Sequence, residues 1–219
     1  MSKVVIAGAK RTALGALLGQ FTGVPATQLG STAIKAAVEQ AGVAGDKVDE
    51  VIMGCVLPAG VGQAPARQAA LGAGLPLSAG CTTINKVCGS GMKATMLAHD
   101  LILAGSNEIM VAGGMESMSN APYLLPKARA GYRLGHGQMF DHMFLDGLED
   151  SYSKENKGRL MGTFAEDCAG HFNFTRSAQD EFAIASTTRA QAAINNGDFT
   201  WEVTPVTVSG RKGDLVVDK

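Results

Sequence analysis

Short apolar runs alternate with segments of helical period along the first half of the chain. Apolar and β-branched residues form strand-length runs at four places, 4–9, 48–53, 81–87 and 109–112. Between these runs, apolar residues recur every three or four positions, as on one face of a helix, over 29–41, 65–71 and 89–104. Strands that alternate with helices in this way are typical of an α/β fold, in which helices cover a sheet.

The pattern changes after Gly114. From there to about Leu160 no period is sustained, and prolines, glycines and charged residues are scattered through the segment. A structureless loop of this length is uncommon in a compact domain, so we expect an organised insertion with a role of its own. The predicted organisation is an α/β domain whose first part covers 1–114, an inserted loop domain over 115–200, and a return strand with the start of a next segment over 201–219.

Two further elements are predicted in the last third of the chain. A helix is expected over 177–195, with Thr175 or Ser177 as the N-cap residue. A half-exposed strand is expected over 202–208, where polar and apolar residues alternate. Pro205 cannot donate a hydrogen bond to a neighbouring strand, which favours a sheet edge or a strand end.

Composition and charge exclude several classes of protein. Nineteen lysines and arginines against twenty aspartates and glutamates give a net charge of −1, so no strong field points to nucleic acid or to a membrane surface. The apolar runs are far shorter than the roughly 20 residues of a membrane-spanning helix. The first residues contain one positive charge and a run too short for a secretory signal, which predicts a cytoplasmic protein.

Four cysteines are spread along the chain without a C-x-x-C pair. Their spacing describes neither a disulfide framework nor a zinc site. The four histidines form no helical pair with a nearby acid, so no metal site is predicted. We expect reduced thiols, with three of them in structural positions, Cys55, Cys81 and Cys168.

Cys88 differs from the other cysteines because it lies between a strand pattern and a helix that begins in small residues. The run from Asn85 to Lys93 reads NKVCGSGMK. Amide N–H groups at a helix start favour a thiolate over a thiol, and the thiolate is the form that attacks a carbonyl or thioester carbon. A buried, unreactive cysteine is the commoner alternative, but the small residues around this thiol leave room for a substrate. Cys88 is therefore the predicted nucleophile.

A catalytic cysteine also needs a general base. His99 lies eleven residues after Cys88 on the same predicted helix, about three turns away, and is too distant for this role. His136 and His142 belong to the segment without periodicity, where a solvated histidine is the more common case. The sequence thus predicts a nucleophile without a base of its own.

Other catalytic motifs do not match. Gly60 and Gly62 precede a predicted helix, but Pro65 stands where a dinucleotide-binding loop needs its third glycine. Residue 88 is cysteine rather than the first glycine of G-x-S-x-G, which disfavours serine-hydrolase chemistry. A small basic group either faces an anionic ligand or a partner subunit, or is a solvated surface; it consists of Lys127, Arg129 and Arg133.

Three motifs stand in order along the chain. They are NKVCGSGMK at 85–93, GGMESMS at 113–119 followed by Ala121-Pro122-Tyr123, and MGT at 161–163 followed by Ala165-Glu166-Asp167. Together they resemble the thiolases, the acetyl-CoA C-acyltransferases, and the resemblance extends from Val4 to Asp218. It implies a thiolase-like layered α/β fold, with a mixed sheet flanked by helices and an inserted loop domain.

The resemblance also implies a site. Cys88 matches the cysteine that takes the acyl group from an acyl-CoA, and Leu148 and Met161 match positions that line the tunnel for pantetheine and acyl chain. Acyl-CoA and coenzyme A are the implied substrates, with no permanently bound cofactor, and the implied assembly is a homo-oligomer, a dimer or a tetramer. Leu160 stands where many biosynthetic members carry a histidine, which leaves the acyl-chain preference open.

Thiolases have a second half of similar fold, which supplies an asparagine–histidine pair and a second cysteine for acid and base work. The 219 residues contain no counterpart of this half. We therefore expect the N-terminal half of a thiolase, inactive alone, from an enzyme that condenses acetyl-CoA to acetoacetyl-CoA or cleaves 3-ketoacyl-CoA. The alternatives are a non-catalytic assembly subunit that pairs with a separate chain, and a decarboxylating ketoacyl synthase, which the GGMESMS motif disfavours.

Overall fold

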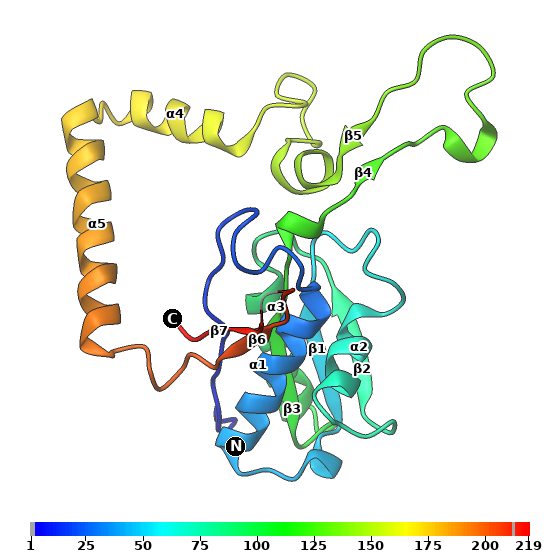
Figure 1. Ribbon diagram of the computed structural model, residues 1–219, viewed down its shortest axis with the longest axis vertical. Helices are drawn as coiled ribbons and strands as arrows, with labels where there is room; N and C mark the ends of the chain where they lie inside the picture. Colours follow the sequence, from blue (N-terminus) through cyan, green and yellow to red (C-terminus); the bar gives the residue numbers. More distant parts are fainter. Residues whose placement is uncertain (1–2, 212) are drawn as a thin grey trace. The chain divides into compact units, whose positions relative to one another are not determined.

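The computed structural model describes residues 3–211 and 213–219, and the chain divides into two compact units (Figure 1). The first unit consists of Met1–Pro122 with Glu202–Lys219, and the second of Tyr123–Trp201. The first unit contains the α/β sheet and Cys88. The second unit overlaps the segment expected to be an inserted loop domain, 115–200, whose status as a domain stays a prediction.

Three parallel strands in the order β2-β1-β3 form the sheet of the first unit. The central strand β1 (Glu50–Gly54) pairs with β2 (Gly80–Ile84) and with β3 (Met110–Gly114). After its first residue β1 is buried throughout, because both of its edges are hydrogen-bonded and helices cover both of its faces. The carboxyl ends of all three strands lie at the same end of the sheet.

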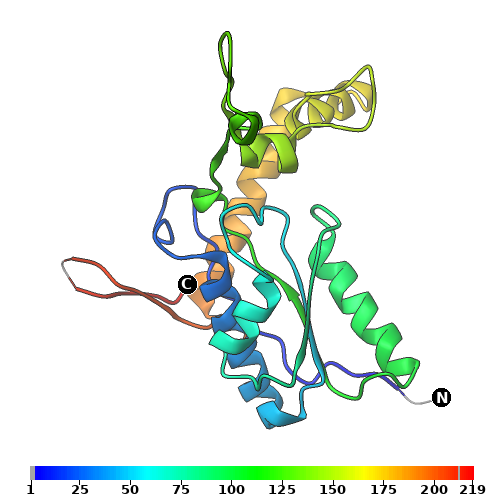
Figure 2. The same ribbon diagram turned by 90° about the vertical axis from the view of Figure 1, so that its right-hand side faces the viewer.

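Helices lie on both faces of this sheet, as Figure 2 shows. α1 (Ala26–Ala41) and α2 (Pro65–Gly72) pack against each other on one face, and α3 (Ser90–Leu103) lies on the other. α2 begins at a proline, whose missing N–H is one that a first helical turn leaves unpaired anyway. α1 ends at Gly42, whose left-handed backbone (φ 65°) lets its N–H bond back into the last turn. The predicted α/β fold is confirmed.

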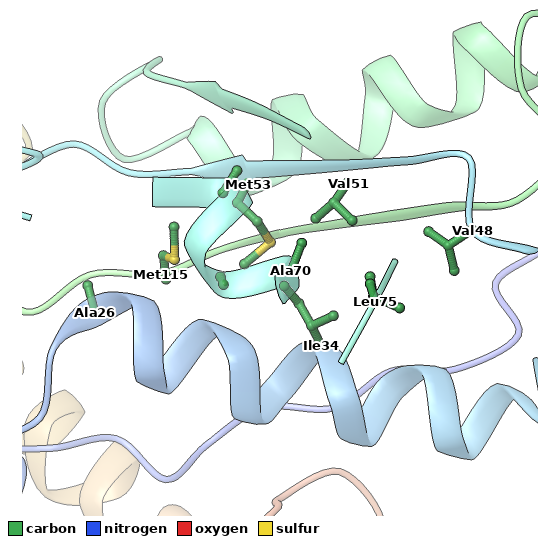
Figure 3. Close-up of a cluster of buried hydrophobic side chains, with 10 residues drawn as sticks. Ala26, Ile34, Val48, Val51, Met53, Ala70, Leu75 and Met115 are labelled. Atoms are coloured by element: carbon green, nitrogen blue, oxygen red, sulfur yellow. The ribbon is translucent and has the colours of Figure 1, made fainter. Parts of the chain in front are cut away.

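A cluster of buried apolar side chains joins β1 to α1 and α2 (Figure 3). Val51 and Met53 of β1 pack in it with Ile34 of α1 and Leu75, which follows α2. α2 contributes three fully buried alanines, whose small side chains let the helix lie close to the strand: Ala66, Ala69 and Ala70. Removal of this apolar surface from water holds the two helices on the sheet.

The prediction of a strand over 4–9 is wrong. No ladder joins this segment to another strand among the described residues, and Val5 and Ile6 are 76% and 80% exposed. The apolar pattern is typical of a strand, but a strand forms only where a second backbone pairs with it. Here the Ala9 N–H donates to the Gln40 side chain at 2.7 Å instead.

Two other predicted strands are shorter in the structure. The run over 81–87 ends as a strand at Ile84, because the next residues form the turn that leads to α3. Of 202–208, only β6 (Val206–Val208) is a strand, and it pairs in antiparallel fashion with β7 (Leu215–Val217), which was not predicted. The apolar run over 109–112 corresponds to β3, which is only partly buried because it pairs on one side in this three-stranded sheet.

The hairpin of β6 and β7 is attached to the N-terminal segment of the first unit. Val206 and Val217 share a second buried cluster with Phe21. Arg11 pairs with Glu202 through a 2.7 Å ion pair and a 2.9 Å backbone hydrogen bond. The returning chain is therefore part of the first unit by packing and by hydrogen bonding, although about 190 residues separate these segments.

Short elements open the second unit. β4 (Tyr123–Leu124) pairs with β5 (Phe140–Asp141), and a π-helical turn follows at Phe144–Leu148. π-helical turns are rare and are frequently found at functional sites. The expectation of loops and short elements in this part of the chain is confirmed.

Two helices complete the second unit. α4 (Met161–His171) was not predicted; it begins directly after the segment without a sustained period, which ends at about Leu160. α5 (Arg176–Asn196) confirms the predicted helix, and the Thr175 hydroxyl caps it by accepting the Ala178 N–H at 3.2 Å. Among the residues that the structure describes, no helix has both the length and the apolar character needed to cross a membrane.

Asp49 ties the start of β1 to the residues before β3. Its Oδ2 accepts the backbone N–H of Ile109 at 2.9 Å and of Glu108 at 2.7 Å. These bonds hold the pKa of Asp49 below its ordinary value. Because the folded pKa is lower than the unfolded one, the carboxylate stabilises the fold above the unfolded pKa of about 4, and this contribution is lost as the pH falls through the folded pKa.

The substitution Asp49→Asn is expected to lower the urea midpoint of unfolding at neutral pH, because a neutral amide oxygen accepts these bonds more weakly than a carboxylate. The deficit measured at about pH 6 should shrink at about pH 3, below the unfolded pKa of about 4, where the wild-type carboxylate begins to be protonated. Urea titrations followed by circular dichroism measure both effects. Asp46→Asn, on the neighbouring exposed turn, is the matched control; a deficit of the same size at both pH values would contradict the account.

The end of β1 packs directly against the start of α3. A Cβ on Gly54, the last residue of β1, would lie 2.5 Å from the Ser90 Cβ and 2.9 Å from the Ser90 carbonyl carbon. A Cβ on Gly91 would lie 3.7 Å from the backbone between Gly113 and Gly114, at the end of β3. Glycine at 54 therefore sets how closely α3 approaches the central strand.

We expect Gly54→Ala to destabilise the first unit by about 1–3 kcal/mol, because the added methyl group meets backbone that cannot move without shifting α3. Gly23→Ala is the control, since nothing lies within 4 Å of a Cβ at that position. Its effect should stay within about 0.5 kcal/mol. Urea unfolding measures the stability of both variants. Equal free energies of unfolding would show that the contact at Gly54 is not tight.

Candidate active site

Cys88 lies on the turn that connects β2 to α3, at the carboxyl ends of the three parallel strands. The residue is exposed. α3 begins at Ser90 with Gly89 as its N-cap residue, so the predicted helix start at 89 is confirmed to within one residue. Open α/β sheets bind ligands outside the carboxyl ends of their strands, which makes this a suitable place for a reacting group.

The backbone of this turn is held by two side chains. Val87 has a left-handed backbone with φ 47°. Asn85 Oδ1 accepts the Val87 N–H at 2.8 Å, and the Ser90 hydroxyl donates to the Val87 carbonyl at 2.5 Å. Ser90 Oγ also accepts the Lys86 N–H at 2.9 Å. The hydroxyl of Ser90, a residue only 5% exposed, is thus paired on both sides.

Glu116 holds the loop that leaves the central strand. Its carboxylate accepts the Val56 N–H at 2.7 Å and the Leu57 N–H at 3.1 Å. The Asn85 side-chain amide donates to the Val56 carbonyl at 3.4 Å. Residues that follow β1, β2 and β3 are therefore joined by hydrogen bonds beside the cysteine turn. Carboxylate acceptors make such bonds stronger than neutral ones.

The other cysteines have different surroundings. Cys55 is 2% exposed, and burial raises the pKa of its thiol to about 12, to which the Glu116 carboxylate 3.6 Å away adds. Burial also raises the pKa of Cys81. Both positions agree with the predicted structural roles. Cys168, expected to be structural as well, is instead exposed on α4.

Leu148 and Met161 are brought together in the second unit. Leu148 is the last residue of the π-helical turn and Met161 the first residue of α4. Their neighbours in sequence, Glu149 and Leu160, form an antiparallel bridge. Met161 is 46% exposed and Leu148 is partly buried, so both have apolar surface available to a ligand. Cys88 belongs to the first unit.

None of the histidines in the first unit lies on the cysteine turn. His99 is on α3, exposed and 3.1 Å from Asp100. In the second unit, His136 is exposed, and His142 is buried with its Nδ1 2.6 Å from Asp146 Oδ2. Within 3–211 and 213–219, no group of three or more histidine, cysteine, aspartate or glutamate side chains is placed to hold a metal ion.

The roles of Asn85, Ser90 and Glu116 were missed at the level of sequence, where these residues counted only as parts of motifs. Only the role of Asn85 could have been found from local sequence, because an asparagine whose side chain accepts the N–H two residues later is typical of an Asx turn. Glu116 had no local signal: its partners Val56 and Leu57 are about 60 residues away in sequence.

Comparison with known proteins agrees with the motifs. The family model for "Thiolase, N-terminal domain" matches residues 4–219. The chain is 52% identical to an acetyl-CoA acetyltransferase of Cupriavidus necator, with all of this chain and 55% of that protein covered. It is 52% identical to acetyl-CoA acetyltransferase 2 of Arabidopsis thaliana over 99% of the chain and 53% of the relative. It is 47% identical to the mitochondrial acetyl-CoA acetyltransferase of Mus musculus, over 99% of the chain and 50% of the relative.

These matches confirm the predicted family. They also show a difference in length, because the chain spans about half the length of the curated relatives it matches. A family model that covers nearly every residue, and relatives about half identical over the whole chain, show that this chain belongs to the thiolase family, where it corresponds to the N-terminal domain.

Proposed function

We propose that Cys88 is the acyl-accepting nucleophile of an acetyl-CoA acetyltransferase of which this chain forms the N-terminal half. The observation that carries the proposal is an exposed thiol two residues before α3, at the carboxyl ends of the strands. The relatives' names support acyl-CoA as the substrate class. In this function acyl-CoA and coenzyme A are substrates, and no cofactor stays bound.

The proposed reaction has two steps. The Cys88 thiolate attacks the thioester carbonyl of an acyl-CoA, a carbon–sulfur bond to the enzyme forms, and the bond to coenzyme A breaks. The coenzyme A thiolate leaves and takes up a proton. A base then removes a proton from the methyl group of acetyl-CoA, the enolate carbon attacks the acyl carbonyl, and the Cys88 thiolate leaves; an acetyl group gives acetoacetyl-CoA. In the reverse direction a 3-ketoacyl-CoA is cleaved by free coenzyme A.

The negative oxygen that develops on the thioester carbon needs hydrogen-bond donors. Backbone N–H groups at Cys88 and at the Gly113–Gly114 end of β3 are the proposed donors, because the start of α3 lies against that end of the strand. Leu148 and Met161 are proposed to line the path of the pantetheine and acyl chain. Their neighbour Leu160 offers no proton to a thioester, which points to binding rather than acid–base work in this part of the second unit.

The general base is proposed to come from outside these 219 residues. His99 is about three helical turns from Cys88. The relatives are about twice as long as the chain, which supports a second half as the source. We propose further that the active protein is a homo-oligomer, or that a separate chain supplies this half; a non-catalytic assembly subunit is the alternative.

Cys88 is expected to react with iodoacetamide at neutral pH faster than Cys55 and faster than Cys168. Cys55 is buried and its pKa is raised to about 12, so it should be nearly inert. Cys168 is the sharper control, because it is exposed like Cys88 but lies inside α4 rather than before a helix start. Peptide mass spectrometry of the alkylated chain gives the three rates. Equal rates for Cys88 and Cys168 would show that the helix start does not activate the thiol.

Incubated with acetyl-CoA, the chain is expected to gain one acetyl group on Cys88 but not to turn over. Thiolysis of acetoacetyl-CoA should require a polypeptide that corresponds to the second half of a relative. Cys88→Ala should abolish both the adduct and the reconstituted activity, whereas Cys168→Ala should preserve both. Sustained thiolysis by the chain alone would contradict the proposed division of roles, and an adduct that persists in Cys88→Ala would refute the nucleophile.

A further inference from the structure

Val87, the residue before Cys88, has a left-handed backbone. A side chain branched at Cβ rarely adopts this conformation, and residues held in it against their preference gather at active sites. We propose that Asn85 and Ser90 are positioning residues that hold Val87 in this conformation and thereby fix the direction in which Cys88 presents its thiol. The inference rests on the proposed function of Cys88 as the nucleophile.

The hydrogen bonds of the turn act on both sides of Val87. Its N–H is bound by Asn85 and its carbonyl by Ser90, and Ser90 also binds the Lys86 N–H. Two backbone bonds of 3.1 Å also hold the turn, from the Gly89 N–H to the Lys86 carbonyl and from the Ser90 N–H to the Val87 carbonyl. The side chains of Asn85 and Ser90 add to these bonds in fixing the peptide planes before and after Val87. The second of these planes contains the amide nitrogen of Cys88, so the rotation of Val87 decides where the cysteine points.

Both positioning side chains are themselves anchored. The Cβ of Ser90 lies against Gly54, a position with no room for a Cβ of its own. Ser90 is therefore placed directly on the central strand. Asn85 is joined to the Val56 carbonyl, and the Val56 N–H is bound by the Glu116 carboxylate. The turn is thus set by the rigid ends of the sheet before a substrate arrives, which is the condition for low reorganisation at a reacting group.

The way Ser90 uses its hydroxyl supports a role beyond stabilising α3. A serine in the N-cap position accepts an N–H of the first turn, but Ser90 follows the N-cap as the first helical residue, so its hydroxyl is free for other partners. α3 has Gly89 as its N-cap residue and no side-chain cap bond. The Ser90 hydroxyl points back to residues 86 and 87 instead. Val87 and Cys88 are themselves exposed, so their side chains add nothing to the buried core.

Four variants of the full chain test the proposal: Ser90→Ala, Asn85→Ala, Val87→Asn, and the double variant Val87→Asn with Ser90→Ala. Asparagine adopts the left-handed conformation readily, so it should hold the turn without help from Ser90. Thr95→Ala is the matched control, because the Thr95 hydroxyl also bonds a backbone carbonyl of α3, at 3.1 Å, without touching the turn. Circular dichroism and urea unfolding establish that each variant folds.

Two rates are measured at Cys88 by mass spectrometry: alkylation by iodoacetamide and acetylation by acetyl-CoA. Ser90→Ala and Asn85→Ala are expected to slow both reactions, acetylation by roughly ten- to a hundredfold, the size of effect that a misplaced reacting group produces. Thr95→Ala should match the wild type. The double variant should recover most of the loss seen in Ser90→Ala, a rescue that general destabilisation of α3 would not produce.

The outcomes separate the inference from the function on which it rests. Acetylation rates of Ser90→Ala and Asn85→Ala equal to that of Thr95→Ala would overturn the positioning role, as would a loss that Val87→Asn does not relieve. If Ser90→Ala does not fold, Asn85→Ala replaces it in the test, together with a fifth variant that combines Asn85→Ala with Val87→Asn, because Asn85 is exposed. If the wild type gains no acetyl group while alkylation still shows the loss and the rescue, the proposed function fails and the positioning role stands.

Discussion

The contact between the end of β1 and the start of α3 is the constraint on which the placement of Cys88 depends. Because Gly54 leaves no room for a side chain, the first residue of α3 lies directly on the central strand. β1 is hydrogen-bonded on both edges and buried along nearly its whole length, so this contact has a rigid base. The cysteine is exposed because it lies on a turn, and the turn has a fixed position because of the sheet.

Polar side chains extend this rigidity to the loops at the carboxyl ends of the strands. Loops are ordinarily the mobile parts of a fold, because their backbone groups bond to water. Here Glu116, Asn85 and Ser90 bind the backbone groups of the loops that follow β1 and β2. Each of these side chains comes from a different loop or helix, so the three segments support one another. A reacting group can then stay open to solvent and still be held in one orientation.

The second unit has a different physical character. α4 and α5 contain no fully buried residue, and large apolar side chains on α5 are exposed, Phe182 and Ile184 among them. Helices in proteins gain most of their stability from the packing of an apolar face. This exposure, together with the unpaired apolar segment at 4–9, supports the proposal that the active protein contains more than these 219 residues.

The sequence by itself determined the elements whose signal is local. The apolar period of α1, α2 and α3, the N-cap residue of α5 and the apolar run of β1 are properties of residues close together in sequence. The same is true of the small residues around Cys88 that indicate a nucleophile. Only the tertiary structure decided which segments pair, that 4–9 does not form a strand, that β6 pairs with β7, and that Glu116 binds the loop after β1. The left-handed backbone of Val87 belongs to this second group as well. Strand pairing, backbone strain and side-chain anchoring depend on partners that are distant in sequence, and no local pattern of apolar and polar residues records them.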